Sequence, residues 1–125
     1  MATMKDIEKN LKKKGVNFEV RPDSSIRVVW TFENGRSQLV DLVSKDGLLI
    51  ACSPIGKYED NIAAKVLKSA SQTFFGVAIL FDEYIALVTT MPIADLDEDE
   101  LEWCLGALPA AADLVEKEVF GSDDF

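Results

Sequence analysis

Apolar residues occupy nearly every position between Val77 and Met91, and this pattern predicts a β-hairpin that is covered on both faces. One strand runs from Val77 to Phe81, a turn falls at Asp82-Glu83, and the second strand runs from Tyr84 to Met91. Successive side chains on a strand point to opposite faces, so a sheet with one face in water alternates apolar and polar residues. A chain of 125 residues can place its helices over one face, and the other face then needs a partner. The pattern therefore favours an interaction protein.

An alternating pattern earlier in the chain predicts a three-stranded antiparallel meander. A short alternating segment from Val16 to Val20 ends at a turn before it. The three strands are expected over residues 26–32, 37–43 and 48–52. Large side chains share one face of the first strand, and we expect Trp30 and Phe32 in the core. The segment from Ser53 to Gly56 is expected to end the sheet.

The Asn34-Gly35 pair predicts how the first two strands of the meander are aligned. Asn-Gly favours a two-residue type I′ turn, because both residues tolerate a positive φ. Such a turn places Val29 opposite Val40, on the face away from Trp30. We therefore expect Val29, Val40 and Leu42 to form a second apolar patch on the meander.

Apolar residues at helical spacing predict three helices. The first covers residues 4–14 and stops at Gly15, where glycine is favoured just past a helix end. The second begins at Asp60, and its apolar side repeats every four residues at Ile62, Val66, Ala70 and Phe74.

The third helix is expected to begin at Asp97, with Glu100 three residues later in a capping-box arrangement. Its core stripe is centred on Leu101, Leu105, Leu108 and Val115. A second strip lies roughly 120° around the helix axis and consists of Trp103, Ala107, Ala110 and Leu114. Gly106 and Pro109 predict a kink or a break near residues 106–109, because proline removes a backbone hydrogen bond.

These elements predict one two-layer α+β domain over residues 1–125. An antiparallel sheet, made of the three-stranded meander and the two-stranded hairpin, packs against three helices in the order α-βββ-α-ββ-α. We expect a homodimer, because apolar surface remains beyond what the helices can cover. The candidate dimer or partner surface consists of Val29, Val40, Leu42, Trp103, Ala107, Ala110 and Leu114.

The residue types offer little for catalysis or metal binding. The chain contains no histidine, which excludes Ser-His and Cys-His nucleophile pairs and imidazole ligands. Phosphate-binding glycine loops, the nucleophile elbow and the calcium loop are absent from the sequence. The two cysteines, Cys52 and Cys104, match no metal or redox spacing and are expected to be buried free thiols. We expect no enzyme activity, no metal and no cofactor.

Net charge and hydropathy limit which partners we expect the protein to bind and in which compartment we expect it. The net charge is −9, and residues 95–125 carry eleven acidic residues against Lys117 alone. A field of this sign repels phosphate backbones, so we expect no nucleic-acid ligand. The acidic run from Asp95 to Glu102 is interpreted as the favourable first turn of a helix. With no apolar run of about 18–20 residues and no apolar leader at residues 1–6, we expect no membrane association and a cytoplasmic location.

The order of elements resembles the type III secretion chaperone-like fold, whose class I members are small, acidic homodimers. Residues 48–92 and the segment Leu96–Leu101 are similar in layout to those chaperones. Residues 35–40 (Gly-Arg-Ser-Gln-Leu-Val), residues 53–56 (Ser-Pro-Ile-Gly), and Ala111-Ala112-Asp113 with Glu116 look more like the YbjN-type family. The resemblance covers nearly the whole chain. It implies a bacterial protein.

Three functional hypotheses follow from the sequence. The leading hypothesis is a non-enzymatic, chaperone-like protein-binding module that holds an extended segment of a client protein or peptide, by strand addition or by burial in a groove. The alternative is a YbjN-type sensory-transduction regulator domain of unknown ligand. A carboxylate-based enzyme is a third and weaker hypothesis, because no acidic residues converge in a motif.

Overall fold

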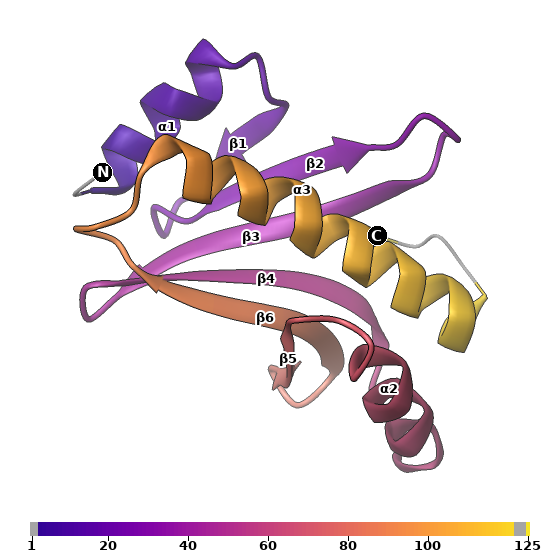
Figure 1. The fold of residues 1–125 in the computed structure, drawn as a ribbon. Coiled ribbons are helices and arrows are strands. Elements are labelled where there is room, and N and C mark those ends of the chain that lie inside the picture. The colour runs from indigo at the N-terminus through magenta and orange to yellow at the C-terminus, as the bar shows by residue number, and fades with distance from the viewer. Residues whose placement is uncertain (1–2, 122–124) are drawn as a thin grey trace.

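The computed structural model describes residues 3–121 and residue 125, which form one antiparallel sheet with helices packed against it (Figure 1). The helices are α1 (Met4–Lys13), α2 (Ala63–Ala70) and α3 (Glu98–Val115), with a 3₁₀ turn η1 (Asp60–Ile62) before α2 and a π-helical turn η2 (Glu116–Phe120) after α3. The strands are β1 (Phe18–Val20), β2 (Ile26–Thr31), β3 (Ser37–Lys45), β4 (Leu48–Lys57), β5 (Gly76–Leu80) and β6 (Tyr84–Pro92). The predicted α+β class and element order are confirmed, and β1 adds a strand before the meander.

The strands lie in the order β1-β2-β3-β4-β6-β5, so that β1 and β5 are the two edges of the sheet. Helices α1 and α3 lie over one face, and α2 lies beside β5 (Figure 1). The core fills the space between this face and the helices, and Leu42, Ala51 and Leu87 are fully buried there. Helix α2 joins the same core through Val66 and Ala70.

The alignment of β2 and β3 differs from the prediction by one residue. Val29 lies opposite Leu39, and Val28 lies opposite Val40. The turn is longer than a two-residue type I′ turn, because the Phe32 N–H donates to the Arg36 carbonyl at 2.8 Å across three loop residues. Gly35 takes the left-handed conformation, with φ +85°, that such a three-residue loop needs. The one-residue shift moves Val40 and Leu42 to the helix-covered face, so the predicted patch of Val29, Val40 and Leu42 is wrong.

Strand β4 continues through the segment 53–56, where the sequence predicted the sheet to end. Pro54 cannot donate a hydrogen bond, but the β3–β4 pairing has already ended at Asp41 and Cys52. Side chains bridge the widening gap: the Ser53 hydroxyl donates to the Leu39 carbonyl at 2.6 Å, and the Gln38 amide donates to the Pro54 carbonyl. A register shift between Pro54 and Gly56 then keeps β4 paired with β6.

The ends of α1 and α3 follow the expected rules. Thr3 and Asp6 form a capping box at the start of α1, and Gly15 follows its end with φ +69°. At the start of α3, the Asp97 carboxylate accepts the Glu100 N–H at 2.8 Å. Helix α3 is continuous from Glu98 to Val115 with Pro109 inside it, so of the predicted kink or break the break does not occur, and the kink stays a prediction.

Three aromatic residues differ from their expected places. Phe74 lies beyond the end of α2 and is 94% exposed, so it does not continue the apolar side of that helix. Trp30 is half-buried and packs against the edge of the core, and Phe32 is half-buried at the end of β2. The core is therefore built mainly from aliphatic side chains.

Candidate protein-binding surfaces

An apolar groove of about 370 Å³ lies between helix α2 and the edge strand β5. Val66 anchors α2 in the core, while Leu67 on the next position remains 61% exposed above the groove. From the sheet, Ile79 contributes a side chain that is 49% exposed. The groove is lined by Tyr58, Ala63, Val66, Leu67, Val77, Ala78, Ile79 and Ile85. Aliphatic side chains left exposed around a groove are typical of a site for an apolar partner.

The strand that borders this groove is an edge strand without charge. β5 pairs with β6 on one side only, so its other side presents backbone N–H and C=O groups to a further strand. The thirteen residues from Ser69 to Phe81 include no acidic or basic side chain. Phe74 before the strand and Phe81 after it are 94% and 95% exposed. The edge therefore combines open backbone groups with large exposed apolar side chains.

Phe81 is held in a backbone conformation that is unusual for its type. Its φ is +53° and that of Asp82 is +56°, so the turn begins one residue earlier than the predicted Asp82-Glu83. Bulky residues rarely adopt a positive φ, because the side chain crowds the backbone. The turn thus displays a phenylalanine at a position where glycine or asparagine is usual.

The face of the sheet opposite the helices is a second apolar surface. The register places Val29, Leu39, Val43, Ile50 and Val88 on it. Within the described part of the chain, the helices lie on the other side of the sheet. We call this the open face. The sequence inference that both faces of the sheet are apolar holds, although the residues on the meander differ from those predicted.

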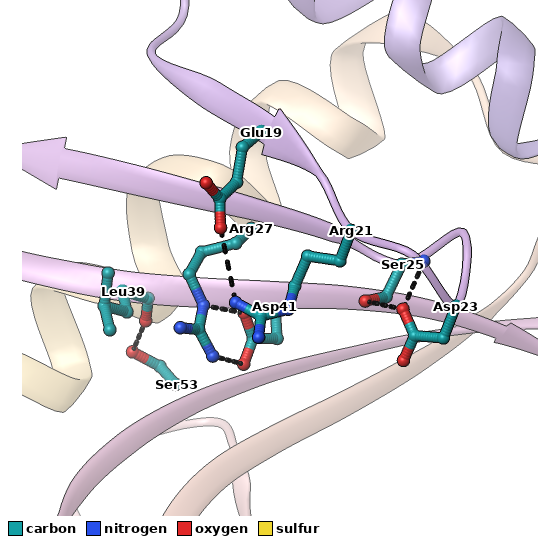
Figure 2. Close-up of polar contacts among 8 residues, drawn as sticks. All are labelled: Glu19, Arg21, Asp23, Ser25, Arg27, Leu39, Asp41 and Ser53. Carbon is teal, nitrogen blue, oxygen red and sulfur yellow. Dashed lines mark hydrogen bonds and ion pairs between the residues drawn. The ribbon is translucent and has the colours of Figure 1, made fainter.

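One end of the open face carries ion pairs, shown in Figure 2. Arg27 binds Asp41 with two hydrogen bonds, of 2.8 and 3.1 Å, and Arg21 binds Glu19 at 3.3 Å (Figure 2). The Asp41 carboxylate raises the pKa of Arg27 through this contact. The charged groups therefore lie on β1, β2 and β3, with the apolar residues of β2 and β3 beside them, while Ile50 on β4 and Val88 on β6 lie further across the sheet.

The predicted surface residues of α3 lie where the sequence placed them, along one side of the helix. Trp103 is 56% exposed and Leu114 43% exposed, while Ala110 is exposed and Ala107 half-buried. The Trp103 ring contacts Phe75, with ring centroids 5.9 Å apart. This strip therefore touches the loop that leads into β5. Of the meander residues proposed for the surface, only Val29 lies on the open face, because Val40 and Leu42 are fully buried.

The titratable groups offer limited chemistry. Across residues 3–121 and residue 125, no cluster of three or more His, Cys, Asp or Glu side chains could hold a metal ion. Both cysteines are buried free thiols, and burial raises the pKa of Cys104 to about 11. Burial also raises the pKa of Cys52, with a further contribution from Asp41. No helix of the described residues is long and apolar enough to cross a membrane.

The fold and these surfaces define a two-layer α+β domain with one helix-covered and one open sheet face. No protein-family model and no curated protein matches the chain. Among solved structures, the fold is similar to that of YbjN from E. coli, "a putative transcription regulator", with a TM-score of 0.68. The match covers 95% of this chain and 92% of that one at 10% sequence identity, so it shows a YbjN-like fold.

Two features of the candidate site, the groove and the edge position of β5, were not predicted from the sequence. The groove depends on α2 lying beside β5, and the sequence does not specify that β5 is an edge strand. The signal that could have indicated it is the uncharged run of residues 69–81 in an otherwise acidic chain. The structure also joins the β2–β3 turn to α3, because Arg36 Nε lies 2.8 Å from Asp113 Oδ1.

Proposed function

We propose that the chain is a non-enzymatic protein-binding module that holds an extended segment of a partner protein at the β5 edge. The observation that carries this proposal is the coincidence of an open, uncharged edge strand with an apolar groove beside it. A segment added to β5 gains main-chain hydrogen bonds along the strand, and every second side chain points toward the groove.

The groove and the charge of the chain indicate the chemistry of the bound segment. Alternate residues of the segment would be aliphatic or aromatic, since the groove side of β5 presents Val77 and Ile79. The chain carries a net charge of −9, which attracts a basic segment and repels an acidic one. We therefore infer that the partner segment is extended, apolar at every second position and basic overall.

The open face supports a second contact, between two copies of the chain. Its apolar side chains include Val43, which is 38% exposed, and Leu48, which is 39% exposed. Packing two open faces together would cover them without occupying the β5 edge. In this proposal the protein is a homodimer with two segment-binding edges.

Selection from a displayed peptide library tests the segment proposal without knowledge of the natural partner. We expect the purified chain to select peptides with alternating apolar residues and a positive net charge. Ile79→Lys places a charge at the groove and should abolish the selection. Val43→Lys is the matched control, because it adds the same charge to a similarly exposed apolar residue on the open face. Selection that survives Ile79→Lys unchanged would contradict the β5 site.

Sedimentation of the same two variants tests the dimer. The open-face proposal predicts that Val43→Lys is a monomer and Ile79→Lys remains a dimer. A monomeric wild-type chain at high micromolar concentration would contradict the dimer while leaving the segment-binding proposal standing.

The second candidate function is a regulator domain, which the YbjN-like fold favours. A domain with a net charge of −9 is poorly suited to contact duplex DNA directly, so such a regulator would act through a protein or a small ligand. Fluorescence anisotropy with labelled duplex DNA at physiological salt tests whether the chain itself binds DNA. We expect no binding, and salt-sensitive binding would favour a regulator that contacts DNA itself.

A further inference from the structure

An aromatic side chain, Tyr58, lines the groove beside β5 near the turn that joins β5 to β6. The Tyr58 N–H donates to the Glu83 carbonyl at 2.8 Å, which fixes this residue beside the turn. Leu80, the last residue of β5, pairs with Tyr84, and Tyr84 pairs with Lys57 on β4. A segment added along β5 therefore reaches Tyr58 where the strand ends.

A carboxylate lies next to this aromatic ring. The Tyr58 hydroxyl donates to Asp60 Oδ1 at 2.6 Å, and this hydrogen bond, together with the charge of Asp60, raises the pKa of the hydroxyl. Turn η1 leads directly into α2, and Asp60 lies three residues before Ala63 and seven before Leu67, which both line the groove. Residues at this spacing share one side of a helix. Both observations place the Asp60 carboxylate on the side that faces the groove.

The Asp60 carboxylate is exposed and has no cationic partner among the residues that the structure describes. The neighbouring base, Lys57, lies 3.6 Å from Glu83 instead. Helix capping does not explain the position of Asp60, because no side-chain hydrogen bond caps the start of η1. The Tyr58 end of the groove therefore offers an aromatic ring beside a negative charge, while the other lining residues are apolar.

We propose that the groove recognises one arginine of the bound segment at its Tyr58 end. The guanidinium lies against the Tyr58 ring and forms an ion pair with Asp60, while apolar side chains of the segment fill the rest of the groove. Arginine suits both contacts, because its planar cation stacks on aromatic rings and pairs with carboxylates. This inference rests on the proposed segment binding at β5. It replaces a general preference for basic segments by one positive residue at one position.

Selection from a displayed library of random short peptides tests the position of the positive charge. From the wild-type chain, we expect peptides with arginine at one fixed place relative to their alternating apolar residues. From Asp60→Asn, the apolar alternation should persist and the preference for arginine should be lost. Asp46→Asn is the matched control, because it removes the same charge at the β3–β4 turn, where asparagine tolerates the φ of +52°. This control should select the same peptides as the wild type.

Calorimetry with one selected peptide, and with a form that has glutamine in place of the arginine, measures the contact itself. The wild-type chain should bind the arginine form about fivefold more tightly, as expected for one exposed ion pair with a cation–π contact. Asp60→Asn should bind both forms equally, with the affinity that the wild type has for the glutamine form.

Two results would overturn the arginine site while segment binding at β5 stands. One is equal affinity of the wild-type chain for the two peptides, which does not depend on the folding of any variant. The other is an undiminished preference for arginine in Asp60→Asn. If the wild-type chain selects no peptides with alternating apolar residues, segment binding is contradicted and the arginine site with it.

Discussion

The two edges of the sheet are built in opposite ways. β1 has three residues, with Glu19 at its centre paired to Arg21 at 3.3 Å, and Pro22 follows directly. β5 has five residues and no charge, and the exposed rings of Phe74 and Phe81 flank it. Short length, charge and proline are the devices that prevent an edge from pairing with other chains. The chain thus protects one edge and leaves the other able to accept a strand.

An open apolar edge is tolerable only if unwanted pairing is suppressed elsewhere. The net charge of −9 opposes non-specific pairing between copies of the chain at this edge, since like-charged molecules repel. The same charge favours basic segments over acidic ones. The contrast between the edges therefore points to selective pairing at β5 rather than to a defect in the fold.

The largest expected effect is on stability, and it distinguishes a core residue of α3 from a residue on the surface strip of the same helix. Leu108 is fully buried in the core of α3, and Leu108→Ala should lower the free energy of unfolding by about 2–5 kcal/mol. Leu114, on the strip that reaches the β5 loop through Trp103, is 43% exposed. Leu114→Ala should cost less than about 1 kcal/mol. Urea denaturation measures both, and equal losses would make the strip part of the core.

The pH dependence of stability tests the burial of Cys104 in the core and requires no substitution at either edge of the sheet. The folded state holds the pKa of Cys104 at about 11, above its ordinary value of 9.0. Between these values the unfolded thiol ionises while the folded one stays protonated, so raising the pH favours unfolding. The contribution is fully present below pH 9 and should fall by about 1–2 kcal/mol between pH 9 and 11. Cys104→Ala should show a shallower pH dependence in thermal melts, and an unchanged slope would contradict the assignment.

Relieving the backbone strain at Phe81 tests whether this residue lowers the stability of the fold while contributing to peptide binding at β5. Phe81→Gly removes the cost of a bulky residue at φ +53° and should raise the stability by about 1 kcal/mol. It also removes an exposed ring beside the edge, so binding of a selected peptide should weaken. A variant that is more stable and binds equally well would show that the ring serves no partner.

The smallest effect is expected at the protected edge. Glu19→Val removes the exposed ion pair with Arg21 and should change the stability by less than about 0.5 kcal/mol. Peptide binding at β5 should be unchanged. Gain of a second peptide site in this variant would show that Glu19 alone protects β1, and that its short length contributes little.

Local sequence patterns predicted most of the helices and strands. By contrast, the wrong length for the β2–β3 loop assigned the wrong residues to each face of the meander. The hairpin over 77–91 and the start of α3 at Asp97 follow from residue type and spacing. Asn34-Gly35 fits both a two-residue and a three-residue loop. The observed three-residue loop places the side chains of Val40 and Leu42 on the helix-covered face, where they are part of the core. A single-residue shift in register exchanges the two faces of a strand.

The candidate site was only partly predictable, because it depends on contacts between distant segments. The strip of Trp103 and Leu114 is visible in the helical periodicity of α3. The β5 edge and its groove require the strand order, which placed β6 between β4 and β5. Pro54 misled because it lies beyond the end of the β3–β4 pairing, where its missing N–H costs no bond to β3. Pro109 lies inside the continuous helix α3, which forms in spite of the one backbone hydrogen bond that proline removes.

Titration of one selected peptide against three forms of the chain tests the central claim most directly. Calorimetry should show that Ile79→Lys weakens binding at least about thirtyfold, because a charge enters an apolar site. Val43→Lys, on the open face, should leave the affinity within about twofold of the wild-type value. The opposite result, with binding lost in Val43→Lys and kept in Ile79→Lys, would place the partner on the open face and contradict a binding site at β5.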